Sequence, residues 1–348
     1  MTGWNFCSDN VAGTSPAILK AMTQAAVGSV TPYGDDPITA KVEEKLREVF
    51  ETDLTAYLVA TGTSANSLAL SALCPPYGTI YCHPDSHIVV DECNAPEFFT
   101  GGAKLVTIDA ADGKIDAPAL EMALAAGWAG IEHHPQPAAV SLTQASEAGT
   151  VYTPDALGGI SEVCRSHGLG LHVDGARFAN AVVSLGCSAA DISWRAGVDA
   201  LSFGATKNGA LAAEAVLFFR NGLADDFRFR RKRAGHLFSK MRFLSAQMDA
   251  YLTDELWLAN ARHANAMAQR MADGLTALAG VTFLHEVQAN ELFVHMPKAM
   301  REGLAADGFY FYHWVAGGPD CVRLVTAFDT DVDAVTEFIN SARQHAEN

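Results

Sequence analysis

One lysine in this chain of 348 residues stands apart from other charges. Lys207 follows the largely apolar run 198–203 in the sequence SFGATKNG, where its neighbours are small and uncharged. Most lysines of this kind are surface residues without a special role, because lysine is rarely buried. The small neighbours nevertheless leave room for a carbonyl compound to reach the amine, so Lys207 is a candidate for Schiff-base formation.

Two other groups of residues lie where predicted strands end. Gly62, Thr63 and Ser64 follow a strand and open a helix, where backbone N–H groups and the helix dipole favour a phosphate, although an ordinary helix cap has the same composition. Asp174 ends another strand in the sequence LHVDGAR, where it could cap a turn or pair with a protonated ring nitrogen. Together with Lys207, these residues match the phosphate, ring nitrogen and aldehyde of pyridoxal phosphate.

A histidine follows a further predicted strand in the sequence DSHIVVDE. His87 could lie flat against a cofactor ring, or it could be an ordinary polar loop residue. His83 and His87 are four residues apart, which superficially suggests a metal site. Pro84 argues against a helix that presents both histidines on one face, so we predict no metal site.

These groups need a scaffold in which several strands end at one edge. From about residue 56 onward, short apolar runs alternate with helical patterns, which indicates an α/β fold with a mainly parallel sheet covered on both faces. Ligands of such open sheets bind beyond the carboxyl ends of the strands. The predicted strands are 56–60, 79–82, 104–108, 138–142, 170–173, 199–203 and 215–220, and the clearest helices are 64–73, 117–126 and 153–167.

The pattern changes after residue 220. A long helical stretch, roughly 225–278, leads to short strands near 281–283, 292–295 and 321–325 and to a closing helix from 332, which indicates a smaller α+β domain. A chain of 348 residues exceeds the size at which one core stops growing. We expect an N-terminal arm and large cofactor-binding domain over residues 1–235 and a small C-terminal domain over residues 236–348.

Composition excludes several classes of protein. A hydrophobic content of 49% excludes a disordered chain, and a net charge of −16 argues against general nucleic-acid binding. The basic run 228–233 is an exception; it could be a solvated helix face or a local site for an anionic cofactor or a neighbouring subunit. Seven cysteines without CxxC spacing fit a reducing compartment, and neither a signal-peptide pattern nor a membrane-length apolar run is present. We expect a cytoplasmic protein.

The chain resembles the low-specificity L-threonine aldolases, including the phenylserine aldolases, from about Asn5 to the C-terminus. The resemblance rests on Lys207, on His87 with Glu92, and on the segments SDN (8–10), YGDDP (33–37), GTSAN (62–66), DGAR (174–177) and VRLVT (322–326). It implies a fold-type-I pyridoxal-phosphate enzyme, similar in fold to aspartate aminotransferase. The implied activity is that of a carbon–carbon lyase, which cleaves L-threonine, L-allo-threonine and related β-hydroxy-α-amino acids such as phenylserine to glycine and an aldehyde.

The resemblance also implies how the cofactor is held. Lys207 would form the imine with the cofactor's aldehyde, Asp174 would pair with the pyridine nitrogen, and Arg177 would contact the side of the phenolic oxygen. The remaining cofactor-binding residues would be Gly62, Thr63 and Ser64 at the phosphate and His87 stacked on the ring.

Substrate-binding residues follow from the same resemblance. Ser8 and Arg323 would hold the substrate carboxylate, which suits the planar fork of arginine. His133 is the first candidate for the base near the substrate hydroxyl, and His87 is the second, because histidine titrates close to neutral pH. Tyr33 and the basic run would lie near a neighbour's site in a homotetramer built from dimers.

Three segments depart from the family's pattern. A Glu-Asn-Thr-His-Asn segment of many members corresponds here to Thr143–Glu147, which reads TQASE. A Gly-Gly-Gly-Met-Arg-Gln segment is replaced by 235–243, which reads GHLFSKMRF, and Cys7 stands where many members have arginine. These departures concern substrate preference more than cofactor binding.

Other activities remain open at this stage. An aminotransferase or a β-eliminating lyase of the same fold would use the same lysine and aspartate. A non-catalytic cofactor-binding protein would not need the intact pair of Lys207 and Asp174. An NAD-dependent dehydrogenase would need GxGxxG after its first strand, and the sequence GTSAN does not supply it.

Overall fold

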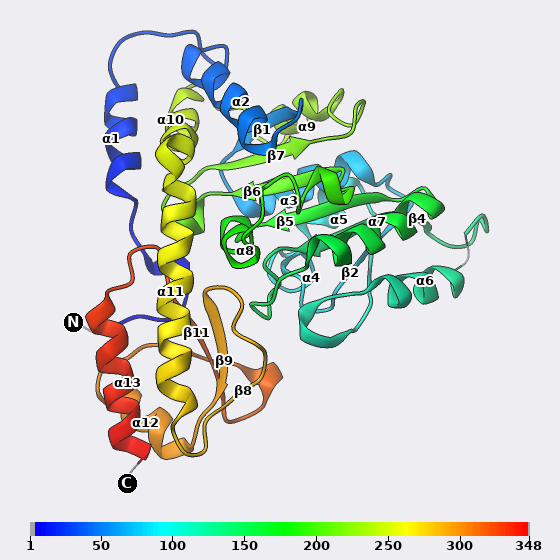
Figure 1. The fold of residues 1–348 in the computed structure, drawn as a ribbon. Helices are drawn as coiled ribbons and strands as arrows, with labels where there is room; N and C mark the ends of the chain where they lie inside the picture. Colours follow the sequence, from blue (N-terminus) through cyan, green and yellow to red (C-terminus); the bar gives the residue numbers. More distant parts are fainter. Residues whose placement is uncertain (1–3, 128, 347–348) are drawn as a thin grey trace.

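A seven-stranded sheet organises the larger part of the chain in the computed structural model, which describes residues 4–127 and 129–346 (Figure 1). Strands β2 to β6 run parallel, whereas β7 is antiparallel to both β6 and β1. The predicted α/β class and mainly parallel sheet are therefore confirmed. The strand order is β1 (Thr55–Val59), β7 (Glu214–Phe218), β6 (Ala200–Gly204), β5 (Gly170–Gly175), β4 (Gln136–Thr143), β2 (Gly78–Cys82) and β3 (Lys104–Thr107).

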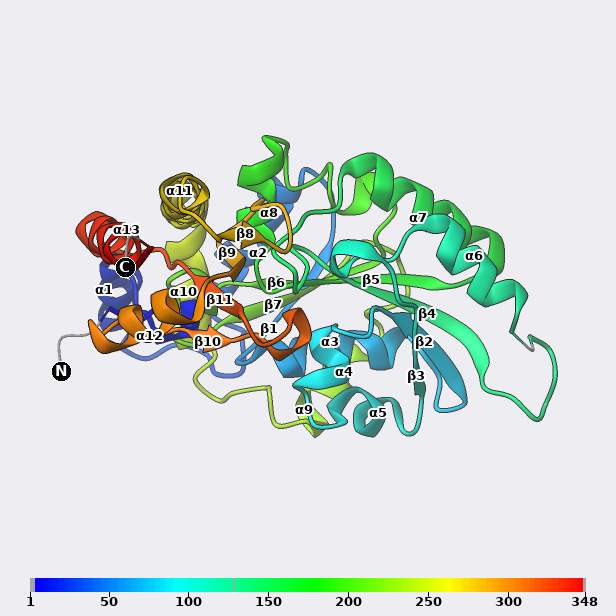
Figure 2. The ribbon, with the colours of Figure 1, turned by 90° about the horizontal axis from the view of Figure 1, so that it is seen from below.

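Helices cover both faces of this sheet (Figure 2). All residues of β2, β5, β6 and β7 are buried, as expected for strands enclosed on both sides. One face carries α6 (Ala117–Ala125), α7 (Pro154–His167) and α8 (Phe178–Leu185), and the other carries α3 (Gly62–Leu73), α4 (His87–Val90), α5 (Ala95–Thr100) and α9 (Phe227–Arg233).

The starts of several helices follow directly from the sequence. Asp36 accepts hydrogen bonds from the first-turn N–H groups of α2 (Pro37–Phe50), and Thr153 does the same for α7. In both helices a proline occupies the first position, where its missing N–H costs nothing. Helix α2 packs with α1 (Pro16–Ala25) around α10 (Arg242–Leu252).

A smaller antiparallel sheet forms the second unit. Its order is β10 (Tyr312–His313), β11 (Cys321–Val325), β9 (Glu291–His295) and β8 (Thr282–Phe283), and it packs with α12 (Lys298–Ala306) and α13 (Val332–Ala346). The N-terminal segment joins this unit, because Phe6 is buried there and its ring centroid lies 5.4 Å from that of Phe338.

The predicted helical stretch 225–278 is divided into α9, α10 and α11 (Leu256–Thr276). The break before α11 lies at Asp254 and Glu255, which have φ values of 51° and 55°. Buried side chains of α10 and early α11, such as Tyr251 and Trp257, belong to the core of the large sheet. The domain boundary after residue 235 stays a prediction. Within the described ranges, no helix combines the length and apolarity needed to cross a bilayer.

Candidate active site

A cavity of about 360 Å³ lies at the carboxyl ends of β4, β5 and β6. Thr143, Asp174 and Ser202 are paired across these three strands and all line it. Strand β1 runs in the same direction as β6, so the loop after β1 reaches the same edge. The structure thus brings together six of the predicted cofactor residues: Gly62, Thr63, His87, Asp174, Arg177 and Lys207.

Lys207 lies on a short 3-10 helix, Thr206–Asn208, that is held from both sides. Asn208 donates to the Tyr251 hydroxyl and to the Trp257 carbonyl, each at 2.8 Å. Gly209 then takes a φ of 111°, which residues with a side chain rarely adopt. The turn is therefore fixed by its neighbours, and the lysine side chain lines the cavity.

Asp174 is buried, and among the described residues it is hydrogen-bonded to amide groups only. Its Oδ1 accepts from the Ala176 N–H at 2.9 Å, and its Oδ2 accepts from Asn66 Nδ2 at 2.7 Å. Asn66 Nδ2 also donates to Glu92 Oε1 at 2.8 Å, and the same oxygen lies 2.9 Å from His87 Nδ1. One hydrogen-bonded chain therefore joins the acid at the end of β5 to the histidine of α4.

These hydrogen bonds and charges change the pKa of the His87 ring. Its hydrogen bond to Glu92 raises the pKa of His87, burial opposes this, and the negative charge of Asp174 adds to the increase. Because Nδ1 is engaged with Glu92, Nε2 is the ring nitrogen left for other partners.

The start of α3 offers backbone N–H groups to an anion. Thr61 caps the helix by accepting from the Ser64 N–H at 3.2 Å, and the Ser64 hydroxyl donates back to the Thr61 carbonyl at 2.8 Å. The N–H groups of Gly62 and Thr63 have no partner within the helix, since they belong to its first turn. Gly62 and Thr63 line the cavity, whereas the polar groups of Ser64 are engaged with Thr61.

Arg177 belongs to a buried network of four charged residues. Its Nε and Nη2 donate to the two oxygens of Asp9 at 2.7 and 3.0 Å, and its Nη1 lies 3.1 Å from Glu291 Oε2. Arg323 Nε donates to the other oxygen of Glu291 at 3.1 Å. Ser8 adjoins this network, and its hydroxyl accepts from the Asn10 N–H. Arg323 and Ser8 thus lie beside the cavity, linked to it through Arg177 and Asn10.

The structure does not bring His133 to this cavity within one chain. His133 is exposed in the loop before β4, and Gln136 pairs with Gly78 at the amino end of β2. The eight residues of β4 separate this end from the cavity, a distance of about 26 Å at the usual rise of a strand. Within one chain His133 therefore lies at the opposite edge of the sheet, and its place near the substrate hydroxyl stays a prediction.

Tyr33 also lies outside the cavity. It is 47% exposed, and the Lys232 ammonium of the basic run lies 5.1 Å from its ring centroid. Tyr33 and Lys232 are therefore neighbours, and neither lines the cavity that contains Lys207.

Two buried glutamates at the cavity were not singled out from the sequence as site residues. Burial raises the pKa of Glu147 and of Glu214 to about 7. Glu214 starts β7 and accepts from the Ala205 N–H at 3.0 Å, which fixes the turn that carries Lys207. An acid at the head of an apolar strand was the signal for Glu214, and the departure from the family's pattern at Thr143–Glu147 was the signal for Glu147.

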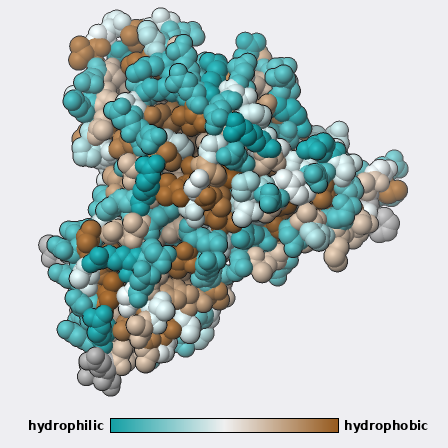
Figure 3. Space-filling view, viewed as in Figure 1, coloured by the Kyte–Doolittle hydropathy of each residue, from teal (hydrophilic) through white to brown (hydrophobic). Residues whose placement is uncertain are grey.

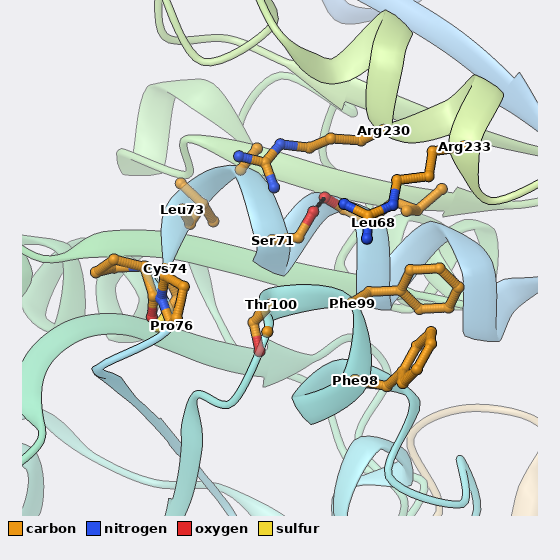
Figure 4. Close-up of a pocket in the computed structure, with 13 residues that line it drawn as sticks. Leu68, Ser71, Leu73, Cys74, Pro76, Phe98, Phe99, Thr100, Arg230 and Arg233 are labelled. Atoms are coloured by element: carbon orange, nitrogen blue, oxygen red, sulfur yellow. Dashed lines mark hydrogen bonds between the residues drawn. The ribbon is translucent and has the colours of Figure 1, made fainter.

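A second cavity of about 760 Å³ lies between α3, α5 and α9 (Figure 4). Its walls are largely apolar, with Phe98 and Phe99 on one side and the guanidinium groups of Arg230 and Arg233 on the other. It contains neither an amine–carboxylate pair nor a histidine, so the first cavity is the candidate active site.

The donor groups of the first cavity fit pyridoxal phosphate. Asp174 forms no ion pair with any residue of the described ranges, although a buried carboxylate without a countercharge is costly. A protonated pyridine nitrogen would supply that charge. The N–H groups at the start of α3 suit a phosphate, and the amine of Lys207 suits an aldehyde.

Comparisons with known proteins agree with this fit. Residues 5–299 match the family model described as beta-eliminating lyase. The low specificity L-threonine aldolase of Pseudomonas aeruginosa is 45% identical over 97% of this chain and 96% of its own length. A second, from Pseudomonas sp., is 44% identical over the same shares of both chains.

Solved structures give the same result. The threonine aldolase of Leishmania major superposes with a TM-score of 0.92 and 30% identity, covering 99% of both chains. Serine palmitoyltransferase of Sphingomonas wittichii, at 17% identity and a TM-score of 0.70 over 99% of this chain and 87% of its own, shares the fold. The chain therefore belongs to the beta-eliminating lyase family of fold-type-I pyridoxal-phosphate enzymes and, within it, to the low-specificity L-threonine aldolases.

Proposed function

We propose that this enzyme cleaves L-threonine, L-allo-threonine and related β-hydroxy-α-amino acids to glycine and an aldehyde. The observation that carries the proposal is the convergence of Lys207, Asp174 and His87 on one cavity. Release of aldehyde and glycine from a panel of such amino acids would test it. Keto-acid formation instead would indicate an aminotransferase or another lyase of the same fold.

Each residue has a stated task in this reaction. Pyridoxal phosphate, when bound, supplies an electron sink for the pair released at Cα. Lys207 would hold the cofactor through its aldehyde, and Asp174 would keep the ring nitrogen protonated. Gly62 and Thr63 would hold the phosphate through their N–H groups, with Ser64 shaping that turn, and Arg177 would contact the side of the phenolic oxygen.

We assign the base to His87 rather than to His133. The Nε2 atom of His87 accepts the hydroxyl proton of the substrate as the Cα–Cβ bond breaks, and the bond to Glu92 holds the ring in place. Positioned base catalysis is typically worth about 10²–10⁴-fold in rate.

His87→Asn is expected to lower kcat by about 10²-fold or more and to alter the visible spectrum of the bound cofactor. His133→Asn is the matched control, because its side chain lies at the opposite edge of the sheet. Steady-state kinetics and absorption spectra of both variants provide the measurement. A loss of kcat in His133→Asn alone would reverse the assignment.

Ser8 and Arg323 are proposed to hold the substrate carboxylate. In this structure the Arg323 guanidinium donates a hydrogen bond to Glu291, so the substrate carboxylate must share or displace this contact. Fixing the carboxylate determines which bond at Cα is aligned for cleavage.

Arg323→Ala is expected to raise KM for L-threonine by about 10- to 150-fold, because a hydrogen bond to a charged group contributes about 1.5–3 kcal/mol. The cofactor spectrum should not change. Arg301→Ala, which loses an ion pair to Asp320 in the same small unit, serves as the control. Equal KM values for the two variants would remove Arg323 from the substrate site.

We also propose a homotetramer built from dimers, in which Tyr33 and the basic run of α9 approach a neighbour's active site. Exposed apolar side chains support such contacts, including Val27 at 79% and Leu211, which lines the cavity, at 55% exposure. Figure 3 shows apolar residues gathered near the middle of one face, beside α10 and α11. Seven cysteines that are all free favour a cytoplasmic location.

A further inference from the structure

Glu147 makes contacts that no step of the proposed reaction explains. It lies in the loop after β4, where its Oε1 accepts from the His87 N–H and from Thr143 Oγ1, each at 2.8 Å. Its Oε2 is buried and has no hydrogen-bond partner among the residues that the structure describes. A buried carboxylate oxygen without a partner is energetically costly, so its presence beside the cavity indicates a role for Glu147.

The contact with His87 is made to the backbone and not to the ring. Helix α4 has a single turn, and Ser86 before it makes no side-chain cap. Glu147 therefore supplies the acceptor for the first N–H of this turn, from a loop distant in sequence. Two carboxyl groups thus hold His87, because Glu92 binds its ring and Glu147 binds its backbone.

Resting on the proposed function, we propose that Glu147 is a positioning residue whose ionised form holds His87 in position over the cofactor. Protonation of Glu147 then releases the base from this position. A hydrogen bond to a carboxylate is roughly twice as strong as one to a neutral acceptor. The ionised group therefore fixes the start of α4 more firmly than the neutral acid does.

Charged and titratable groups on every side influence this carboxyl. Burial raises the pKa of Glu147 to about 7, and the negative charge of Asp174 on β5 acts in the same direction. Hydrogen bonds from His87 and Thr143 oppose the increase. Arg177, Cys82 of β2 and Tyr152 before α7 also interact with it electrostatically. Glu147 therefore changes charge within the neutral range of pH.

The activity should fall as the pH is lowered. Activity needs Glu147 ionised and His87 neutral, and the pKa of His87 is also raised. Two deprotonations then control the acid limb, so log kcat/KM should rise with a slope approaching two. Glu147→Gln keeps an oxygen acceptor but cannot titrate, so its acid limb should have a slope of one. At pH 8 its kcat/KM should be about fivefold lower, since a neutral acceptor replaces a charged one.

Thermal unfolding gives a readout that is independent of turnover. Folding opposes the ionisation of a carboxyl group whose pKa is raised from 4.5 to about 7. The wild-type protein should therefore lose Tm relative to Glu147→Gln as the pH rises from 5 to 8. Thr143→Val removes a hydrogen bond that lowers this pKa, so it should move the acid limb to higher pH.

Glu97→Gln is the matched control, because Glu97 of α5 also has a buried Oε2 without a partner in the described ranges and lies outside the cavity. Its slope should equal that of the wild type. A slope near two in Glu147→Gln, or no difference in Tm between pH 5 and 8, would overturn the proposal. Failure of the wild-type enzyme to release aldehyde would instead overturn the proposed function, and the unfolding experiment would still report on Glu147.

Discussion

Lys207→Ala is expected to lower threonine cleavage by on the order of 10³-fold or more, because the covalent attachment of the cofactor is lost with the amine. The turn itself should survive, since Asn208 and Glu214 hold its backbone without help from the lysine side chain. Cofactor could still bind non-covalently through Asp174 and the start of α3. The defect should therefore lie in kcat, with the fold intact.

The attachment can be tested chemically. Purified wild-type protein should be yellow, and borohydride should fix the mass of the cofactor on the peptide that contains Lys207. The variant should lose this adduct and its visible band. Lys104→Ala, at the start of β3 at the sheet's edge, is the control and should keep both. An adduct on any other lysine would contradict the whole site assignment.

The sequence predicted the residues whose position depends on a single strand end. Asp174 lies at the end of β5 and Lys207 follows β6, and parallel pairing brings the ends of such neighbouring strands together without further information. The apolar runs were sufficient to place the strands of the large sheet, because most of its strands, such as β2, β5, β6 and β7, are buried and therefore form continuous apolar runs.

Residues whose role depends on packing between segments distant in the sequence could not be predicted in this way. Glu147 reaches His87 across 60 positions in the chain, and Glu291 joins Arg177 to Arg323 from the other unit. The break between α10 and α11 requires two residues with positive φ that are neither glycine nor asparagine, so no local signal marks it. The resemblance at short range also does not show at which edge of the sheet the loop of His133 lies, because that depends on how β4 pairs with β2.

The buried charges of the site are arranged in two groups that behave differently. Asp9 and Glu291 are neutralised by Arg177 and Arg323 in close contact, as buried charges generally must be. Neither Asp174 nor Glu147 forms an ion pair within the described ranges, and the negative charge of Asp174 opposes the ionisation of Glu147. Only the second group therefore leaves a charge for the cofactor to neutralise.

Asp174→Asn should remove that charge and lower kcat/KM by about 30- to 4000-fold, since truncating one partner of a buried charged pair costs about 2–5 kcal/mol. The amide fills the same volume, so the fold should persist, but the ring nitrogen would lose its countercharge and the cofactor its electron-withdrawing form. Weaker cofactor retention and a shifted visible band should accompany the loss. Asp199→Asn, at the opposite edge of the same sheet, is the control and should keep near-normal activity.

The same variant should change the pH dependence. The carboxylate of Asp174 raises the pKa of both His87 and Glu147, so its removal should lower both values. The residual activity of Asp174→Asn should then persist to lower pH than that of the wild type, with the acid limb displaced in that direction. Profiles of kcat/KM between pH 5 and 9 provide the measurement. A limb that stays in place while the rate falls would mean that Asp174 acts on the cofactor alone and is not coupled to the two groups that control the base.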